Sequence, residues 1–149
     1  PWPVVAHPPC KRWGKYWFGS PSSPIRFKRG DDDGCFAAAL ASVREFGGVL
    51  EHPEGSSAFA WHGLEKPSRG LGWVEAGDGR GWVCSVEQGH YGHEARKPTW
   101  LYAVGTMRPD LPWGPSVAAK KVENMAKSKR HLTPVPFRDM LLALARSAA

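Results

Sequence analysis

The strongest constraint on the fold is a repeated pattern in which a short apolar run stops at polar or reactive residues. Residues 3–6 end at a histidine, two prolines and a cysteine, residues 49–50 end at Glu-His-Pro, and residues 82–86 lead into the polar residues 87–93. Such runs are typical of strands buried on both faces of a sheet. In an open parallel sheet, ligands bind beyond the carboxyl ends of the strands. We therefore expect the three clusters to meet at one rim.

The segments between these runs predict the helices of an α/β fold. Apolar side chains recur at helical spacing over residues 36–46, with two aspartates at 32–33 to cap the helix and two glycines at 47–48 to end it. Strand, helix and strand in this order are typical of the βαβ unit of a parallel sheet. A further strand is predicted at 99–104 and a helix at 134–144. We predict an open, mostly parallel, Rossmann-like sheet in three layers.

Composition bounds the class of protein. A chain of 149 residues with 42% apolar residues fits one globular domain, which we predict over residues 1–149, with 106–132 as a small recognition or linker region. The net charge of +6 suits a polyanionic partner. Three widely spaced cysteines argue against a disulfide framework and predict a cytoplasmic location. No apolar run approaches the roughly 18 residues that a membrane span needs, so no membrane is expected.

Residues 11–30 predict a long loop rich in tryptophan, glycine, serine, proline and basic groups, and long ordered loops tend to be functional. Its tryptophans, Trp13 and Trp17, either pack into the core or form a platform for stacking bases, and the sequence leaves both open. The basic residues of 120–130 are either a solvated helix face or phosphate contacts. Cys84, His90 and His93 are zinc-ligand types, but their spacing matches no strong zinc template, and we predict no metal.

Four short motifs follow one another along nearly the whole chain. They are Val-Ala-His-Pro-Pro-Cys at 5–10, Glu-His-Pro at 51–53, Tyr-Gly-His-Glu-Ala-Arg-Lys at 91–97 and Thr-Pro-Val-Pro-Phe at 133–137. In this order they resemble the Pro-Pro-Cys, Glu-Asn-Val/Pro, Tyr-Gly-x-Pro-Gln-x-Arg-x-Arg and Val-Pro-x-Pro motifs of DNA (cytosine-5) methyltransferases. The chain is also similar to short phage and prophage proteins labelled methyltransferase-like, which implies the cytoplasm of a bacterium or a phage-infected host.

The resemblance implies methyl transfer to a cytosine flipped out of DNA. Cys10 would be the nucleophile at carbon 6, Glu51 would hydrogen-bond the ring nitrogen and exocyclic amine, and Arg96 would help hold the base. The basic, aromatic residues beside these groups are expected to contact the nucleic acid. These predicted DNA contacts are Lys11, Arg12, Trp13, Trp17 and Lys97.

The chain also departs from the family pattern. Lys11 stands in place of a glutamine and His52 in place of an asparagine, and the sequence has no Phe-x-Gly-x-Gly segment or acidic ribose partner for S-adenosylmethionine. We expect residues upstream of Pro1, or another subunit, to supply the cofactor site. Three functions stay open: a DNA cytosine methyltransferase, a methyltransferase-derived module that binds DNA or protein without catalysis, and another chemistry on nucleotides. The cofactor-binding residues, the target sequence and the oligomeric state are not predicted.

Overall fold

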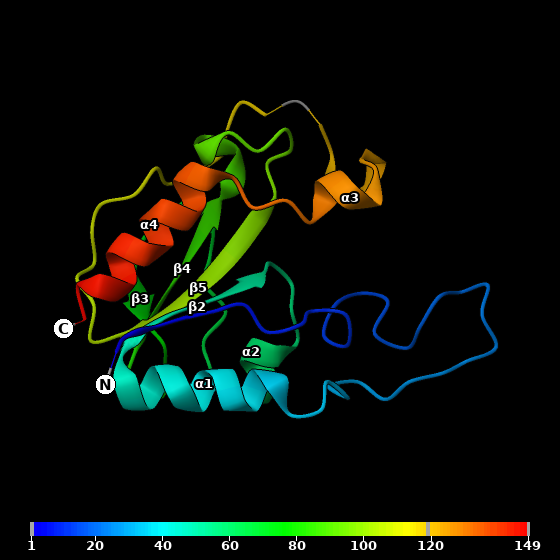
Figure 1. The fold of residues 1–149 in the computed structure, drawn as a ribbon, viewed down its shortest axis with the longest axis horizontal. Helices are drawn as coiled ribbons and strands as arrows, with labels where there is room; N and C mark the ends of the chain where they lie inside the picture. Colours follow the sequence, from blue (N-terminus) through cyan, green and yellow to red (C-terminus); the bar gives the residue numbers. More distant parts are fainter. Residues whose placement is uncertain (1, 119, 149) are drawn as a thin grey trace.

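The computed structural model describes residues 2–118 and 120–148, and Figure 1 shows their arrangement. Within these residues five strands form one sheet in the order β1-β2-β5-β4-β3. The strands are β1 (Val4–Ala6), β2 (Gly48–Pro53), β3 (Val74–Glu75), β4 (Trp82–Glu87) and β5 (Pro98–Val104). The protein is therefore a mixed α/β protein, as predicted.

The directions of the strands correct the prediction of a mostly parallel sheet. Only β1 and β2 pair in parallel, whereas β5 is antiparallel to both of its neighbours, β2 and β4, and β3 is antiparallel to β4. The reason is the connection between β4 and β5, which holds only the 3-10 helix η1 (Gln88–Tyr91) and a turn. A parallel crossover needs a dozen or more residues, usually with a helix. Because β5 is reversed, β1, β2 and β4 still run in the same direction.

Helices lie on both faces of the sheet (Figure 1). The helix α1 (Cys35–Phe46) and the short α2 (Ala58–Trp61) cover one face, and their side chains share a core cluster with Leu50 and Tyr102. The helix α4 (Val135–Arg146) covers the other face, in a second cluster with Val49 and Leu101. Neighbouring residues of one strand thus enter different cores, as the alternation of side chains along a strand requires.

Asp32 and Asp33 were expected to cap α1, but the N-cap residue is Gly34, which has no side chain to cap the helix. The Asp32 carboxylate still accepts a hydrogen bond from the Phe36 backbone N–H at 2.9 Å in the first turn. The two glycines end the helix as predicted: α1 stops at Phe46, Gly47 follows it, and a Cβ on Gly48, whose φ is +123°, would lie 2.0 Å from the Val4 carbonyl oxygen. Only glycine permits this approach, which brings β1 against β2 directly after the helix.

Residues 106–132 contain no strand within their described part, and residue 119 lies outside the described residues. They form loops, the 3-10 helix η2 (Val122–Asn124) and the short helix α3 (Lys127–Arg130). None of the helices described in this chain is long and apolar enough to span a membrane.

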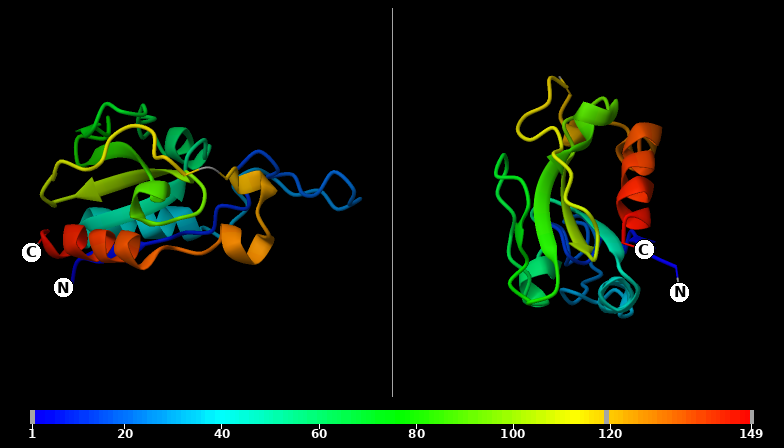
Figure 2. Two further views of the ribbon diagram at one scale, coloured as in Figure 1. Left: turned by 90° about the horizontal axis from the view of Figure 1, so that it is seen from above. Right: turned by 90° about the vertical axis from the view of Figure 1, so that its left-hand side faces the viewer.

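Residues 11–30, which we call the arm, extend away from the sheet (Figures 1 and 2). Two backbone hydrogen bonds join its outgoing and returning limbs, from Gly30 N to the Arg12 carbonyl and from Phe27 N to the Phe18 carbonyl, both at 3.0 Å. The predicted loop is therefore a closed, doubled-back structure whose root lies beside Cys10.

Candidate functional site

The ends of β1, β2 and β4 bring the predicted polar clusters together, because these three strands run in the same direction. Glu51 lies near the end of β2 with its side chain 14% exposed. Its Oε2 is 2.6 Å from His7 Nδ1, which follows β1, and its Oε1 is 3.5 Å from Gln88 Nε2, which follows β4. The expected meeting of the clusters at one rim is confirmed.

Gln88 is the buried support of this carboxylate. It is 1% exposed, and its Nε2 also donates to Thr99 Oγ1 at 3.1 Å, while the Thr99 hydroxyl donates to the Lys97 carbonyl at 3.0 Å. The contact to Glu51 is at the upper limit of hydrogen-bonding distance, whereas the contact to His7 is short. Glu51 is thus held by residues that follow two other strands: His7, which lies within the first motif, and Gln88, which lies in none of the four.

Cys10 lies at the surface directly beyond β1. Partial burial of its sulfur raises the pKa of the thiol, and the negative charge of Glu51 acts in the same direction. The backbone hydrogen bond to the sulfur and the positive charge of Lys97 counteract this rise. The nucleophile and the carboxylate therefore share one electrostatic environment, and at neutral pH the sulfur is mainly the neutral thiol.

Of the two cations in the third motif, Lys97 is the one whose charge acts on Cys10 and Glu51. Burial lowers the pKa of Lys97, while Glu51 and Cys10 act to raise it, and its Nζ donates to the Leu132 carbonyl at 2.9 Å. Arg96 is exposed, and its side chain makes no hydrogen bond or ion pair to any described residue. When the family motif is aligned at Tyr91, its first arginine falls on Lys97, so the motif also points to Lys97 as a site residue.

The backbone at Lys97 is also unusual. Its φ is +45°, one of two positive values among the described residues other than glycine. Left-handed conformations of this kind cost free energy in an ordinary side chain and are concentrated at functional sites. The residue lies immediately before β5 begins.

His52, which stands where the family has asparagine, is a structural residue. It is fully buried, its Nδ1 is 2.7 Å from Ser56 Oγ, and its ring lies 5.1 Å from that of Phe36. Burial lowers the pKa of His52, against the opposite effects of the Pro9 and Pro8 backbone and of Glu51. The imidazole is therefore neutral at physiological pH and packs below the prolines that precede Cys10.

Trp13 corrects the prediction that it contacts DNA. It is only 3% exposed, and its indole N–H donates to Asp32 Oδ2 at 2.8 Å. Its carbonyl accepts hydrogen bonds from the backbone N–H and the hydroxyl of Ser57, both at 2.9 Å. Its ring is thus part of the core, and the packing alternative holds for it. Of the other predicted contacts, Lys11 is exposed, and Arg12 and Trp17 are half-buried in the arm.

The residues considered for zinc do not form a cluster. Cys84 lies in the core beneath α4, where burial strongly raises its pKa, and His93 Nδ1 is engaged with the Ala95 backbone. In the described part of the chain, no three His, Cys, Asp or Glu side chains are grouped so that they could hold a metal ion.

The residues present were also compared with what S-adenosylmethionine requires. A ribose partner would have to be a free carboxylate at the end of a strand, and Glu87 ends β4. It is 4% exposed and already accepts hydrogen bonds from the Ser116 backbone N–H and hydroxyl at 2.7 and 2.8 Å. It is therefore committed to fixing the loop around Ser116. The described residues do not fit the methyl donor.

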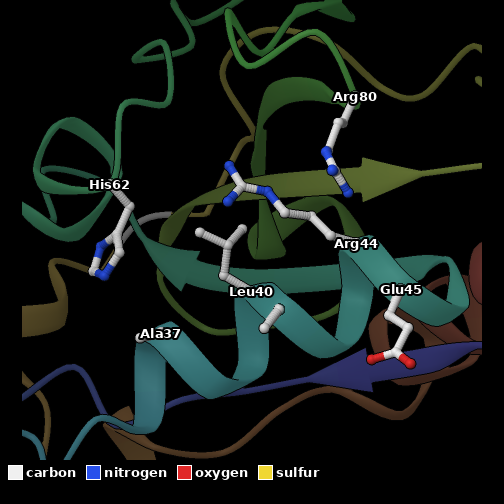
Figure 3. A pocket seen from close by; sticks show the side chains of 7 residues that line it. Ala37, Leu40, Arg44, Glu45, His62 and Arg80 are labelled. Atoms are coloured by element: carbon white, nitrogen blue, oxygen red, sulfur yellow. The ribbon is translucent and has the colours of Figure 1, made fainter.

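A hollow of about 530 Å³ lies elsewhere on the molecule. It is lined by one side of α1, including Arg44, together with His62 and Arg80 (Figure 3). Neither Cys10 nor Glu51 lines this hollow.

Neither a scan against protein-family models nor searches of curated proteins and of solved structures find a match to this chain.

Proposed function

We propose that this chain provides the cytosine-binding side of a DNA (cytosine-5) methyltransferase-like site. The observation that carries the proposal is the meeting of a thiol, a carboxylate and an ammonium group, Cys10, Glu51 and Lys97, which lie far apart in the sequence. These are the residue types needed to add sulfur to a pyrimidine ring and to hold the ring while it reacts. The motifs around Cys10 and Glu51 support the same assignment.

The proposed chemistry of these residues begins with transfer of the Cys10 thiol proton through solvent to the Glu51 carboxylate. Lys97 stabilises the resulting thiolate, which forms a bond to carbon 6 of the flipped cytosine. The electrons of the ring's 5,6 double bond move through carbons 5 and 4 to N3, which takes the proton from the Glu51 carboxyl group, and carbon 5 becomes the nucleophilic carbon of an enamine. In the family, S-adenosylmethionine supplies the methyl group when bound. Because the described residues do not fit that donor, we derive no step through it.

A second candidate is a methyltransferase-derived module that binds DNA or a protein without transferring a group. Two observations favour it. The raised pKa of Cys10 keeps the sulfur protonated at neutral pH, and His7 Nδ1 already occupies Oε2 of Glu51 at 2.6 Å. A site that has lost catalysis would tolerate both features.

Covalent trapping separates the two candidates. The protein is incubated with duplex DNA that contains 5-fluorocytosine, together with S-adenosylmethionine, and in parallel with DNA that contains 2-pyrimidinone, which accepts a thiolate without a methyl donor. Intact-mass spectrometry then detects the protein–DNA adduct. We expect an adduct that Cys10→Ser abolishes and that Cys35→Ser, at another exposed cysteine, leaves unchanged.

Each result bears on the proposal. An adduct that survives Cys10→Ser contradicts the assigned nucleophile. DNA binding without an adduct on either probe identifies the non-catalytic module. If Glu51→Gln forms the 2-pyrimidinone adduct as fast as the wild type, the role of the carboxylate at the ring nitrogen is wrong.

A further inference from the structure

The positive charge of the chain is concentrated on the arm. Residues 11–30 contain six of the 20 lysines and arginines and none of the 14 aspartates and glutamates, so the remaining 14 basic residues balance the 14 acidic ones. The net charge of +6 is therefore the charge of the arm. The arm extends from a body whose formal charge is otherwise zero (Figure 1). Its positive electrostatic potential would therefore attract a polyanion bound beside it.

Cations of the arm lie over one face of three of its aromatic rings. The Arg12 guanidinium lies 3.4 Å from the ring centre of Phe27, and that of Arg29 lies 4.9 Å from the ring centre of Trp17. Arg26 lies over Phe18 at 5.9 Å. Cation–π contacts of this kind hold the arm together in place of a hydrophobic core. They also occupy ring faces on which a base would stack, while guanidinium groups keep N–H donors at their edges for phosphate oxygens.

A hollow at the root of the arm is suited to an anionic group. It has a volume of about 230 Å³ and is lined by residues of the arm and of the turn after β2, namely Trp13, Gly14, Lys15, Trp17, Arg29, Gly55 and Ser57. No acidic residue lines it. Two cations that face the same small space attract a phosphate group and have no counter-charge there.

We propose that the arm binds the sugar–phosphate backbone of DNA, with one phosphate in the hollow between Lys15 and Arg29, and that it does not stack on bases. The choice of DNA as the polyanion rests on the proposed function. The mode of contact rests on the charge of the arm, its covered rings and its hollow. The arm thereby supplies affinity independent of sequence, whereas the rim around Cys10 and Glu51 selects the base.

The test is the salt dependence of binding to a fluorescent duplex, measured by anisotropy. The variant Lys15→Gln/Arg29→Gln removes both cations of the hollow, and Lys66→Gln/Arg146→Gln removes two exposed charges outside the arm. Each lost phosphate contact lowers the slope of log K against log salt by about 0.9, and because the hollow holds one phosphate, the hollow variant should lose about 0.9. Between 50 and 200 mM salt its affinity should then fall about three- to fourfold less than that of the wild type. The control should keep the wild-type slope.

A second binding measurement separates phosphate contact from base stacking. A duplex in which several target-strand nucleotides are abasic keeps its phosphates and loses its bases, and we expect its affinity to stay within twofold of the intact duplex. A loss of about tenfold or more would mean that bases stack on the arm and would overturn the proposal. An unchanged slope in the hollow variant, or a change as large in the control, would also overturn it. Circular dichroism confirms that the variants fold.

The outcome does not depend on the chemistry at the rim. All binding measurements are repeated with Cys10→Ser, which should bind the abasic duplex as the wild type does even if no covalent adduct ever forms. If heparin is bound tightly and the abasic duplex is not, the arm recognises another polyanion and the assignment to DNA is wrong.

Discussion

Asp78 offers the sharpest quantitative prediction, because five hydrogen bonds converge on its carboxylate. Its Oδ2 accepts from Tyr102 at 2.7 Å and from the Arg44 guanidinium at 2.8 and 3.1 Å, and its Oδ1 accepts from the backbone N–H groups of Arg80 and Gly81 at 3.0 and 3.1 Å. Burial acts to raise the pKa of Asp78, but these hydrogen bonds outweigh it and lower the value from 3.8 to about 2. The contacts tie α1 and β5 to the turn before β4.

The magnitude follows from linkage. A tenfold change in proton affinity corresponds to about 1.4 kcal/mol, so the lowered pKa contributes about 2 kcal/mol to the free energy of unfolding. Because the folded state has the lower value, this contribution is complete above pH 4 and is lost as the pH falls toward 2. We expect Asp78→Asn to unfold in urea with a free energy about 2 kcal/mol below that of the wild type at pH 7. The gap should narrow progressively below pH 4.

The control is Asp31→Asn, which removes an exposed carboxylate and should change stability by no more than about 0.5 kcal/mol. Equal stability of Asp78→Asn and the wild type at pH 7 would refute the reasoning. So would a difference in the free energy of unfolding that stays constant from pH 7 to pH 3, because the loss would then come from the changed packing of the side chain and not from the missing charge.

Three further predictions concern the site and the root of the arm. Alkylation of Cys10 by iodoacetamide should be slow at pH 7 and accelerate above pH 9.0, because burial raises its pKa, whereas buried Cys84 should stay unmodified in peptide maps. At pH 8, Lys97→Met should slow this alkylation by about three- to tenfold, since the lost positive charge raises the pKa of Cys10 further; an equal or faster rate would contradict the placement of Lys97. Gly30→Ala should lower the free energy of unfolding by about 1–3 kcal/mol, because Gly30 has a φ of +77° and an added Cβ would lie 2.7 Å from the Trp13 ring. If the variant unfolds in urea with the same free energy as the wild type, that clash does not exist.

Four of the five described strands and the two long helices could be predicted because hydrophobic periodicity records them, whereas the two-residue strand β3 is too short to leave a pattern. The direction of β5 leaves no trace in periodicity, since apolar strands read alike in either direction. The length of the connection after β4 does carry that information, and it was the decisive signal against a parallel pair. The meeting of the rim clusters was nonetheless predictable, because the reversal of β5 leaves β1, β2 and β4 pointing the same way.

The site was predictable where a motif fixed both residue type and position. The motifs of Cys10 and Glu51 come together through His7, whose Nδ1 lies 2.6 Å from Glu51 Oε2, and counting along the third motif points to Lys97. His7 and Gln88 fell within the clusters expected at the rim, but their particular contacts with Glu51 depend on strand order and register, which the sequence does not record. The burial of Trp13 likewise depends on Asp32, two residues beyond the arm.

Trp13 is a fixed point at the root of the arm. The indole is fixed to Asp32, the carbonyl to Ser57, and the amide donates to the Cys10 carbonyl at 3.0 Å. If bound DNA displaced the outer part of the arm, the arm would rotate about Trp13. Only residues 11 and 12 separate Trp13 from Cys10, so that rotation would also shift the sulfur. DNA binding and positioning of the nucleophile would then be coupled.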